Sequence, residues 1–136
     1  MKIITSGLLD EVTDRAVKSP RLRMNYNFHA SLDSKTQRLL NALEPGTVLP
    51  IHRHQNTDET YLLLRGSLQI QFYNDSKELI DSSILNPAEG KYGINIPAGQ
   101  WHTLNVLESG TIIFEVKDGP YQPLEDENIL YIDINK

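Results

Sequence analysis

Residues 46–66 read GTVLPIHRHQNTDETYLLLRG and contain two of the chain's four histidines, His52 and His54, only two positions apart. On a β-strand, side chains at this spacing lie on the same face. Four polar residues, 55–58, then separate the pair from Glu59. This is the length of a turn, so we expect Glu59 to return on a neighbouring strand and face the two imidazoles.

A third histidine joins this group by its position after a turn. His102 follows Pro97-Ala98-Gly99, a segment typical of a turn between strands. Three imidazoles and one carboxylate form a ligand set for one divalent transition metal, and Fe, Zn, Ni, Mn and Co all accept it. The alternative is that these are unrelated polar residues. The predicted ligands are His52, His54, Glu59 and His102.

The rest of the chain is predicted to consist mainly of short strands. Turn residues such as Asn74-Asp75-Ser76 and Ser109-Gly110 separate apolar or alternating runs, a pattern typical of an all-β sandwich or barrel. The strands are predicted at 21–30, 37–43, 59–64, 68–73, 92–96, 103–107, 111–116 and 129–134. A short α-helix is predicted from Ser6 to Lys18, where apolar residues recur at helical spacing just before Pro20.

The predicted strand at 21–30 alternates between polar and apolar side chains. One interpretation of its polar face is an edge strand that presents charge to solvent. However, asparagine is a poor strand former, and the amides and imidazole of this face could line the mouth of a barrel and bind hydroxyls. We expect Asn25, Asn27 and His29 to belong to a substrate pocket and Arg21 to lie at the surface.

Tyr61 and Glu115 complete the predicted substrate pocket. Tyr61 lies two residues after Glu59, so if both lie on one strand its side chain is on the same face and points into the same cavity. The alternative is that Tyr61 packs in the core. Glu115 is expected to hydrogen bond a ligand imidazole from behind, with an outward orientation as the alternative. No residue is assigned as the catalytic base, and His29 and Tyr61 are the candidates.

Several neighbouring residues are expected to lie outside the site. Arg53 and Trp101 each stand beside a predicted ligand, so strand alternation turns them away from the metal. Arg65 borders a turn and is expected to be exposed. The acidic run at 125–127 is expected to be solvated surface.

Residues 46–66 resemble the first motif of the cupin superfamily, Gly-x5-His-x-His-x4-Glu-x6-Gly, at every defined position. Given average residue usage, such agreement arises by chance about once in a million starting positions or less often. The second motif, Gly-x5-Pro-x-Gly-x2-His-x3-Asn, is similar at Pro97, Gly99 and His102, while its first glycine and its asparagine are each displaced by one position. The resemblance implies a cupin β-barrel, the double-stranded jelly roll, with these metal ligands.

The chain is also similar to the WbuC-type family of small single-domain cupins over most of its length. The matching segments are RLLNALEPG (38–46), HRH (52–54), IPAGQWHT (96–103) and FEVKDGPY (114–121). This resemblance implies a bacterial source and a link to surface-polysaccharide metabolism. It implies no particular reaction.

Length and composition limit the remaining possibilities. With 136 residues, the chain is predicted to form a single domain, 1–136. It has no cysteine, which excludes disulfides and thiolate metal ligands. A net charge of -5 argues against a nucleic-acid partner. No apolar run approaches the roughly 20 residues of a membrane span, and residues 1–12 lack a signal-peptide pattern, so we expect a cytoplasmic protein.

From the sequence we expect a metal-dependent cupin that acts on, or binds, a small polar molecule such as a sugar or nucleotide-sugar derivative. A bound metal polarises a carbonyl or lowers the pKa of its water, so an isomerase or epimerase, a hydrolase and a dioxygenase all fit. The alternative is a non-catalytic ligand-binding or structural cupin whose metal serves stability. A homodimer is expected, because edge strands gain cover by pairing.

Overall fold

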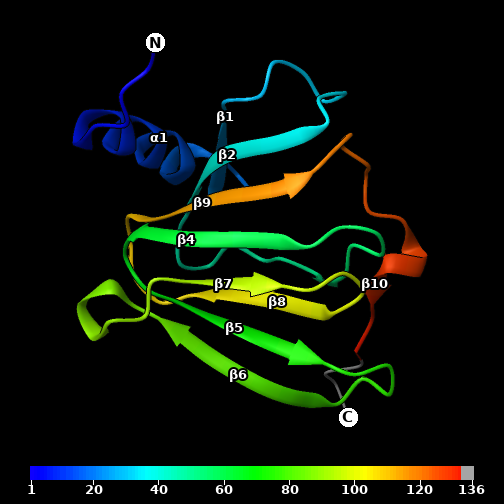
Figure 1. Cartoon of the computed structure of the whole chain (residues 1–136). Helices are drawn as coiled ribbons and strands as arrows, with labels where there is room; N and C mark the ends of the chain where they lie inside the picture. Colours follow the sequence, from blue (N-terminus) through cyan, green and yellow to red (C-terminus); the bar gives the residue numbers. More distant parts are fainter. Residues whose placement is uncertain (133–136) are drawn as a thin grey trace.

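The computed structural model describes residues 1–132, which contain one α-helix and two antiparallel β-sheets (Figure 1). Sheet A has the order β1 (Arg23–Asn27), β2 (Thr36–Leu43), β9 (Thr111–Asp118), β4 (Glu59–Arg65) and β7 (Gly93–Ile96). Sheet B has the order β10 (Ile129–Leu130), β3 (Ile51–His52), β8 (Trp101–Val106), β5 (Leu68–Tyr73) and β6 (Leu79–Leu85). Two short 3-10 helices, η1 (Pro87–Glu89) and η2 (Asp126–Asn128), complete these elements. No helix among the described residues is long and apolar enough to cross a membrane.

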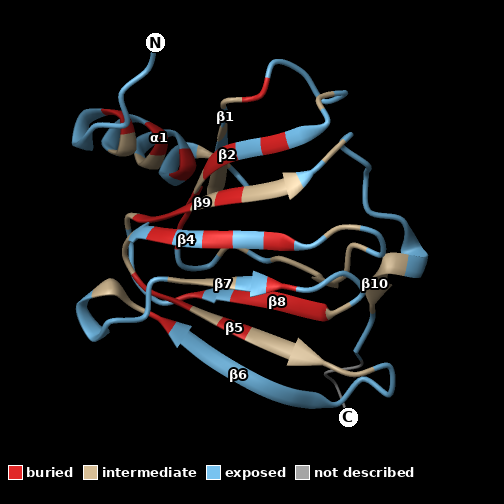
Figure 2. Cartoon of the chain, in the orientation of Figure 1, coloured by how far each residue is buried: buried red, intermediate tan, exposed pale blue. Residues whose placement is uncertain are grey.

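The inner faces of the two sheets enclose the main apolar core. Along β4, Glu59, Tyr61 and Leu63 are buried, while the residues between them are exposed, as expected for a strand with one face toward a core. In Figure 2, β6 at the edge of sheet B is exposed along nearly its whole length. The core consists of Leu43, Tyr61, Leu63, Leu68, Ile70, Leu85, Ile96, Leu104, Val106 and Ile113. The predicted all-β jelly roll is therefore confirmed.

Helix α1 (Ser6–Lys18) has the predicted bounds and packs against β1, β2 and β9. The Thr5 hydroxyl accepts a hydrogen bond from the Leu8 amide at 3.1 Å, which satisfies a free N–H group of the first turn. A second apolar layer joins the helix to sheet A, and its buried members are Leu8, Val12, Ala16, Leu40, Ala42 and Ile112. Burying one large aliphatic side chain stabilises the fold by about 1.5–3 kcal/mol, so this layer holds the helix in place.

Strand β1 is shorter than the strand predicted at 21–30. Leu22 has a φ of 56°, which an extended strand does not contain, so the strand begins after it. The apolar face is as predicted, with Tyr26 packed in the layer under α1. The polar face carries Asn25 and Asn27, which are exposed on the edge strand of sheet A.

The other predicted strands correspond to β2, β4, β5, β7, β8, β9 and β10. β10 ends at Leu130, and residues 133–134 of its predicted range lie outside the described residues. β6 was not predicted, because six of its seven residues are exposed and no alternation marks them. β3 ends at His52, so His54 lies in the loop that follows. The expectation that both histidines share a strand was therefore wrong.

Candidate metal centre

His52 and His102 face each other on neighbouring strands of sheet B. They are paired in register between β3 and β8, and their ring centroids are 4.4 Å apart. Glu59 reaches the same place from β4 of sheet A. We had predicted that the carboxylate would come from a strand next to that of the histidines, but it comes from the opposite sheet. One ligand atom from each of the three residues lies within 4.8 Å of the others. This arrangement can hold a metal ion.

The two imidazoles are oriented by backbone carbonyls. Nδ1 of His52 lies 2.9 Å from the Pro50 oxygen, and Nδ1 of His102 lies 2.9 Å from the Gln100 oxygen. Because a carbonyl oxygen only accepts, each Nδ1 carries the hydrogen, which leaves the lone pair on Nε2 available to a metal.

His102 gives the clearest sign that a metal fits here. Its side chain is 1% exposed, and its Nε2 is buried without a hydrogen-bond partner among the described residues. The nearest carboxylate oxygen, Oε2 of Glu59, is 3.5 Å away and forms no hydrogen bond with this nitrogen. A buried acceptor without a partner lowers the stability of the fold. A metal ion would bind the lone pair of this nitrogen and remove that cost.

His54 approaches the same carboxylate from the loop after β3. Its Nε2 lies 2.5 Å from Oε1 of Glu59, and its ring centroid is 5.3 Å from that of His52. The His54 carbonyl accepts a hydrogen bond from the Gly99 amide at 2.8 Å, which ties the loop to the turn before β8. His54 is not one of the three residues with mutually close ligand atoms, so its role as a fourth ligand stays a prediction.

The surroundings of Glu59 favour its charged form. Burial alone would raise the pKa of Glu59, but the neighbouring imidazoles of His102 and His54 and the hydroxyl of Tyr61 outweigh it and hold the pKa below its ordinary value. The Tyr61 hydroxyl donates to Oε2 of Glu59. Burial, together with the charge of Glu59, raises the pKa of Tyr61 well above its ordinary value. A neutral phenol therefore orients a charged carboxylate toward the imidazoles.

His52 is neutral in these surroundings. Burial lowers the pKa of its imidazole from 6.5 to about 4, and the neighbouring His102 adds to the shift. The neutral imidazole is the form that ligates a metal. Above about pH 4, His52 is therefore already neutral and can bind a metal without first releasing a proton.

Glu115 lies next to Tyr61 on the inner face of sheet A. The two residues are paired in register between β9 and β4. Glu115 accepts a hydrogen bond from Nδ2 of Asn41 to its Oε1 at 2.9 Å. We had expected it to hydrogen bond a ligand imidazole, and that expectation was wrong. Burial raises the pKa of Glu115, and the charge of Glu59 raises it further. Oδ1 of Asn41 is buried without a hydrogen-bond partner among residues 1–132. When Glu115 is protonated, its hydroxyl group is a donor for this oxygen.

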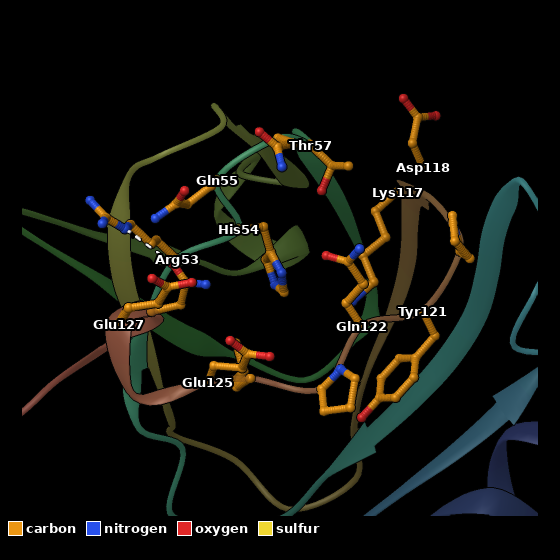
Figure 3. Close-up of a pocket in the computed structure, with 15 residues that line it drawn as sticks. Arg53, His54, Gln55, Thr57, Lys117, Asp118, Tyr121, Gln122, Glu125 and Glu127 are labelled. Carbon is orange, nitrogen blue, oxygen red and sulfur yellow. Dashed lines mark hydrogen bonds between the residues drawn. The ribbon is translucent and has the colours of Figure 1, made fainter.

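A polar pocket of about 330 Å³ opens beside His54 (Figure 3). In the figure, Lys117 and Gln122 stand on one side of His54, and Arg53 and Glu127 stand on the other. The lining residues are Arg53, His54, Gln55, Asn56, Thr57, Lys117, Asp118, Pro120, Tyr121, Gln122, Pro123, Leu124, Glu125, Glu127 and Asn128. Amides, hydroxyls and charges of both signs therefore surround the space beside His54.

The five residues predicted to form a substrate pocket lie elsewhere. Tyr61 and Glu115 are buried beneath the metal centre. Asn25 and Asn27 are exposed on β1. His29 follows β1 and is buried, with Nδ1 3.1 Å from both the amide and the carbonyl of Arg38. None of the five lines the pocket beside His54.

Sequence reasoning missed Lys117 and the segment 118–128. Lys117 is paired in register with Glu59, and its Nζ lies 3.8 Å from Oε1 of that residue. The segment 118–128 forms one wall of the pocket, and it includes Glu125 and Glu127, which we had expected to be solvated surface only. The one available signal was strand alternation. Lys117 lies two residues after Glu115, so on one strand the two side chains share a face.

Arg53 and Trp101 contact each other, and Arg53 lines the pocket beside His54, although we had expected it to lie outside the site. The Arg53 guanidinium lies over the Trp101 ring, 4.3 Å from its centroid, and the indole donates to Asp75 at 2.8 Å. Arg65 is less exposed than expected, because it donates to Asp10 at 2.8 Å and to Thr13 at 3.0 Å. It thereby links β4 to helix α1.

Comparison with known sequences places most of the chain in one family model. Residues 4–85 match the model described as Domain of unknown function (DUF6016). His52, His54 and Glu59 lie inside the matched range, and His102 lies beyond it. No curated protein matches the chain.

Solved structures show the same fold at low sequence identity. KdgF from Halomonas sp. has a TM-score of 0.58 and 14% identity, over 76% of this chain and 84% of that one. The capsular polysaccharide assembling protein CapF from Staphylococcus aureus has a TM-score of 0.62 and 20% identity, over 77% of this chain but only 28% of CapF. The cupin domain of Schizosaccharomyces pombe Cnp3 has a TM-score of 0.56 and 6% identity, over 71% and 64%. The chain therefore has the cupin fold, and the narrower WbuC-type relationship stays a prediction.

Proposed function

The chain belongs to the family described as Domain of unknown function (DUF6016), and we propose that it is a cupin metalloprotein that binds a small hydroxylated molecule beside its metal. The metal is one divalent transition ion. The molecule is a sugar or a sugar derivative. The proposed ligands are His52, His54, Glu59 and His102.

The observation that carries the metal is the unpaired Nε2 of His102. This atom is buried without a partner among the described residues, while the opposite nitrogen is held by the Gln100 carbonyl at 2.9 Å. His52 has the same arrangement with Pro50. Two imidazoles that present bare nitrogens beside a buried carboxylate match the donor set that transition metals prefer.

The pocket supports a small hydroxylated ligand. Its volume of about 330 Å³ is at the lower end of the range of roughly 300–1,000 Å³ found for ligand sites, so a monosaccharide suits it better than a nucleotide-sugar. Its amide lining residues both donate and accept hydrogen bonds, as sugar hydroxyls do. The lining amides are Gln55, Asn56, Gln122 and Asn128. The link to saccharides also rests on the WbuC-type resemblance and on the similarity in fold to CapF, a capsular polysaccharide assembling protein.

The residues of the chain have distinct tasks in this proposal. A bound metal supplies Lewis acidity and acidifies its water. Tyr61 keeps the Glu59 carboxylate in position through its hydrogen bond. The backbone carbonyls of Pro50 and Gln100 fix the two imidazoles. The segment 118–128 covers the approach and orients the bound molecule.

A purely structural metal is the second candidate. It is favoured by the burial of Glu59 and His102, which are 3% and 1% exposed. A metal enclosed in this way would join sheet A to sheet B through Glu59 and the two histidines. Its removal would then reduce stability, and the pocket would have no ligand.

One experiment tests the proposal and separates the two candidates. The chain is purified without added metal, its metal content is measured by plasma mass spectrometry, and its thermal stability is screened against monosaccharides and sugar acids before and after chelation. We expect one transition metal per chain and stabilisation by a monosaccharide that disappears on chelation. At a ligand concentration of about 100 Kd, linkage adds about 2.7 kcal/mol to the free energy of unfolding.

Two results would contradict the proposal. A chain that holds no metal, and that gains no stability from added Fe, Zn, Ni, Mn or Co, has no metal centre. A chain that holds a metal but is stabilised by no monosaccharide and no sugar acid is the structural cupin of the second candidate.

A further inference from the structure

Lys117 places a positive charge in the lining of the pocket. It lies on β9 in register with Glu59, and its side chain is 19% exposed. It lines the pocket beside His54 and also a neighbouring hollow that contains Asn95 and Thr60. The ammonium group is therefore held close to the candidate metal centre and still reaches the space that a ligand would fill.

The ammonium group of Lys117 has little to bind within the chain. Among residues 1–132 it forms no hydrogen bond, and its ion pair is a long one, 3.8 Å to Oε1 of Glu59. That oxygen already lies 2.5 Å from His54, and the other oxygen accepts from Tyr61. An ammonium group has three N–H donors, and a ligand in the pocket can accept from them. The position suits an anionic group supplied by a ligand.

The other charges of the pocket limit the charge of that ligand. Arg53 and Lys117 contribute two positive charges, and Arg53 is engaged with Asn128 at 3.4 Å and with the Trp101 ring. Three carboxylates line the same pocket, namely Asp118, Glu125 and Glu127. They would repel a dianionic phosphate, whereas a single carboxylate beside Lys117 has a charge-assisted partner. The remaining amides suit hydroxyl groups.

We propose that the ligand is a hydroxylated monocarboxylate, a sugar acid, whose carboxylate binds Lys117 in the pocket lining. This inference rests on the proposed function and makes its ligand specific. It excludes neutral sugars, sugar phosphates and nucleotide-sugars as the preferred ligands.

Calorimetric titration of the metal-loaded chain tests this inference. The probes are gluconate, glucose and glucose 6-phosphate, which have similar carbon chains and differ in charge. We expect gluconate to bind at least about tenfold more tightly than the other two, because a charge-assisted hydrogen bond contributes at least this factor.

Matched variants assign the effect to Lys117. Lys117→Met keeps the length of the side chain without its charge, and we expect it to remove the preference for gluconate while metal content and weak glucose binding persist. Lys117→Arg should keep part of the preference. Lys91→Met, at an exposed residue outside the pocket, should bind all three probes as the unmodified chain does.

The outcomes separate this inference from the proposed function. A metal-loaded chain that binds glucose or glucose 6-phosphate as tightly as gluconate overturns the inference alone. Equal gluconate binding by Lys117→Met also overturns it. A chain without metal, or one that binds none of the three probes, overturns the proposed function and this inference with it.

Discussion

His52 and His102 are anchored in the same way, each through Nδ1 to the carbonyl oxygen of the residue two positions earlier in the chain, at 2.9 Å in both cases. Since the two residues are also paired in register, their Nε2 atoms are presented side by side to Glu59. The backbone therefore selects the tautomer before any metal binds. Such preorganisation lowers the cost of assembling a metal site.

Replacing His102 with Ala should weaken metal binding strongly. The variant loses one of the two anchored nitrogens, so we expect metal affinity to fall by more than about 100-fold, the upper end of what loss of a ligand's hydrogen-bond partner costs. Competition with a colorimetric chelator measures the change. His29→Ala is the matched control, because it removes a buried histidine away from the site and should leave metal affinity unchanged.

Tyr61→Phe tests whether the phenol orients Glu59. The variant removes only the hydroxyl that donates to Oε2, and we expect metal affinity to fall by about 10–100-fold while the fold persists. The same chelator competition measures the affinity, and circular dichroism checks the fold. Unchanged affinity would show that Tyr61 only packs in the core.

The metal-free chain should lose stability as the pH falls from 6.5 to about 4. The folded pKa of His52 is lowered to about 4, so the unfolded chain binds more protons in this window and stability falls with pH. The lowered pKa of Glu59 acts in the same direction. Chemical denaturation at several pH values measures the effect, and His52→Gln should flatten the slope. An equally steep slope in His52→Gln would contradict this explanation.

Glu115→Gln should be tolerated at neutral pH. The raised pKa of Glu115 means that its contribution to stability is present below the ordinary pKa and is lost as the pH rises through the folded pKa. A glutamine amide reproduces the protonated acid against Asn41, so the variant should lack this loss of stability with rising pH. Denaturation of both proteins at increasing pH measures the difference. Marked destabilisation of Glu115→Gln at pH 7 would show that Glu115 acts as a charged group.

Gly66→Ala should destabilise the fold by more than its backbone conformation alone requires. A Cβ at this position would lie 2.2 Å from Oγ1 of Thr111 and 2.5 Å from its Cα. Overpacking of this kind costs about 1–3 kcal/mol, in addition to about 1–2 kcal/mol for the left-handed φ of 92°. Gly110→Ala has a similar φ of 81° but open space around it, so thermal denaturation should show a smaller loss there.

Much of the fold was predictable because its signals are local. A short apolar run marked β4, alternation marked β5, and helical spacing ended by Pro20 marked α1 with its observed bounds. β6 was missed because an exposed edge strand has no buried face to produce alternation. The sheet from which Glu59 approaches His52 depends on how the strands are ordered, which no local pattern contains.

The site was predictable only in part for the same reason. Residues 46–66 placed His52 and Glu59 together because few residues separate them. Lys117 was missed because the predicted strand ended at Val116, whereas β9 continues to Asp118. The wall formed by 118–128 depends on distant contacts, such as the hydrogen bond from the Arg53 amide to the Asn128 carbonyl at 3.1 Å.

Anomalous diffraction at the metal absorption edge, from crystals of the metal-loaded chain, tests the central claim most directly. We predict a single peak about 2.0–2.3 Å from Nε2 of His52, Nε2 of His102 and a carboxylate oxygen of Glu59. A peak elsewhere, or a crystal without a peak in which these three side chains contact only one another, would contradict the account.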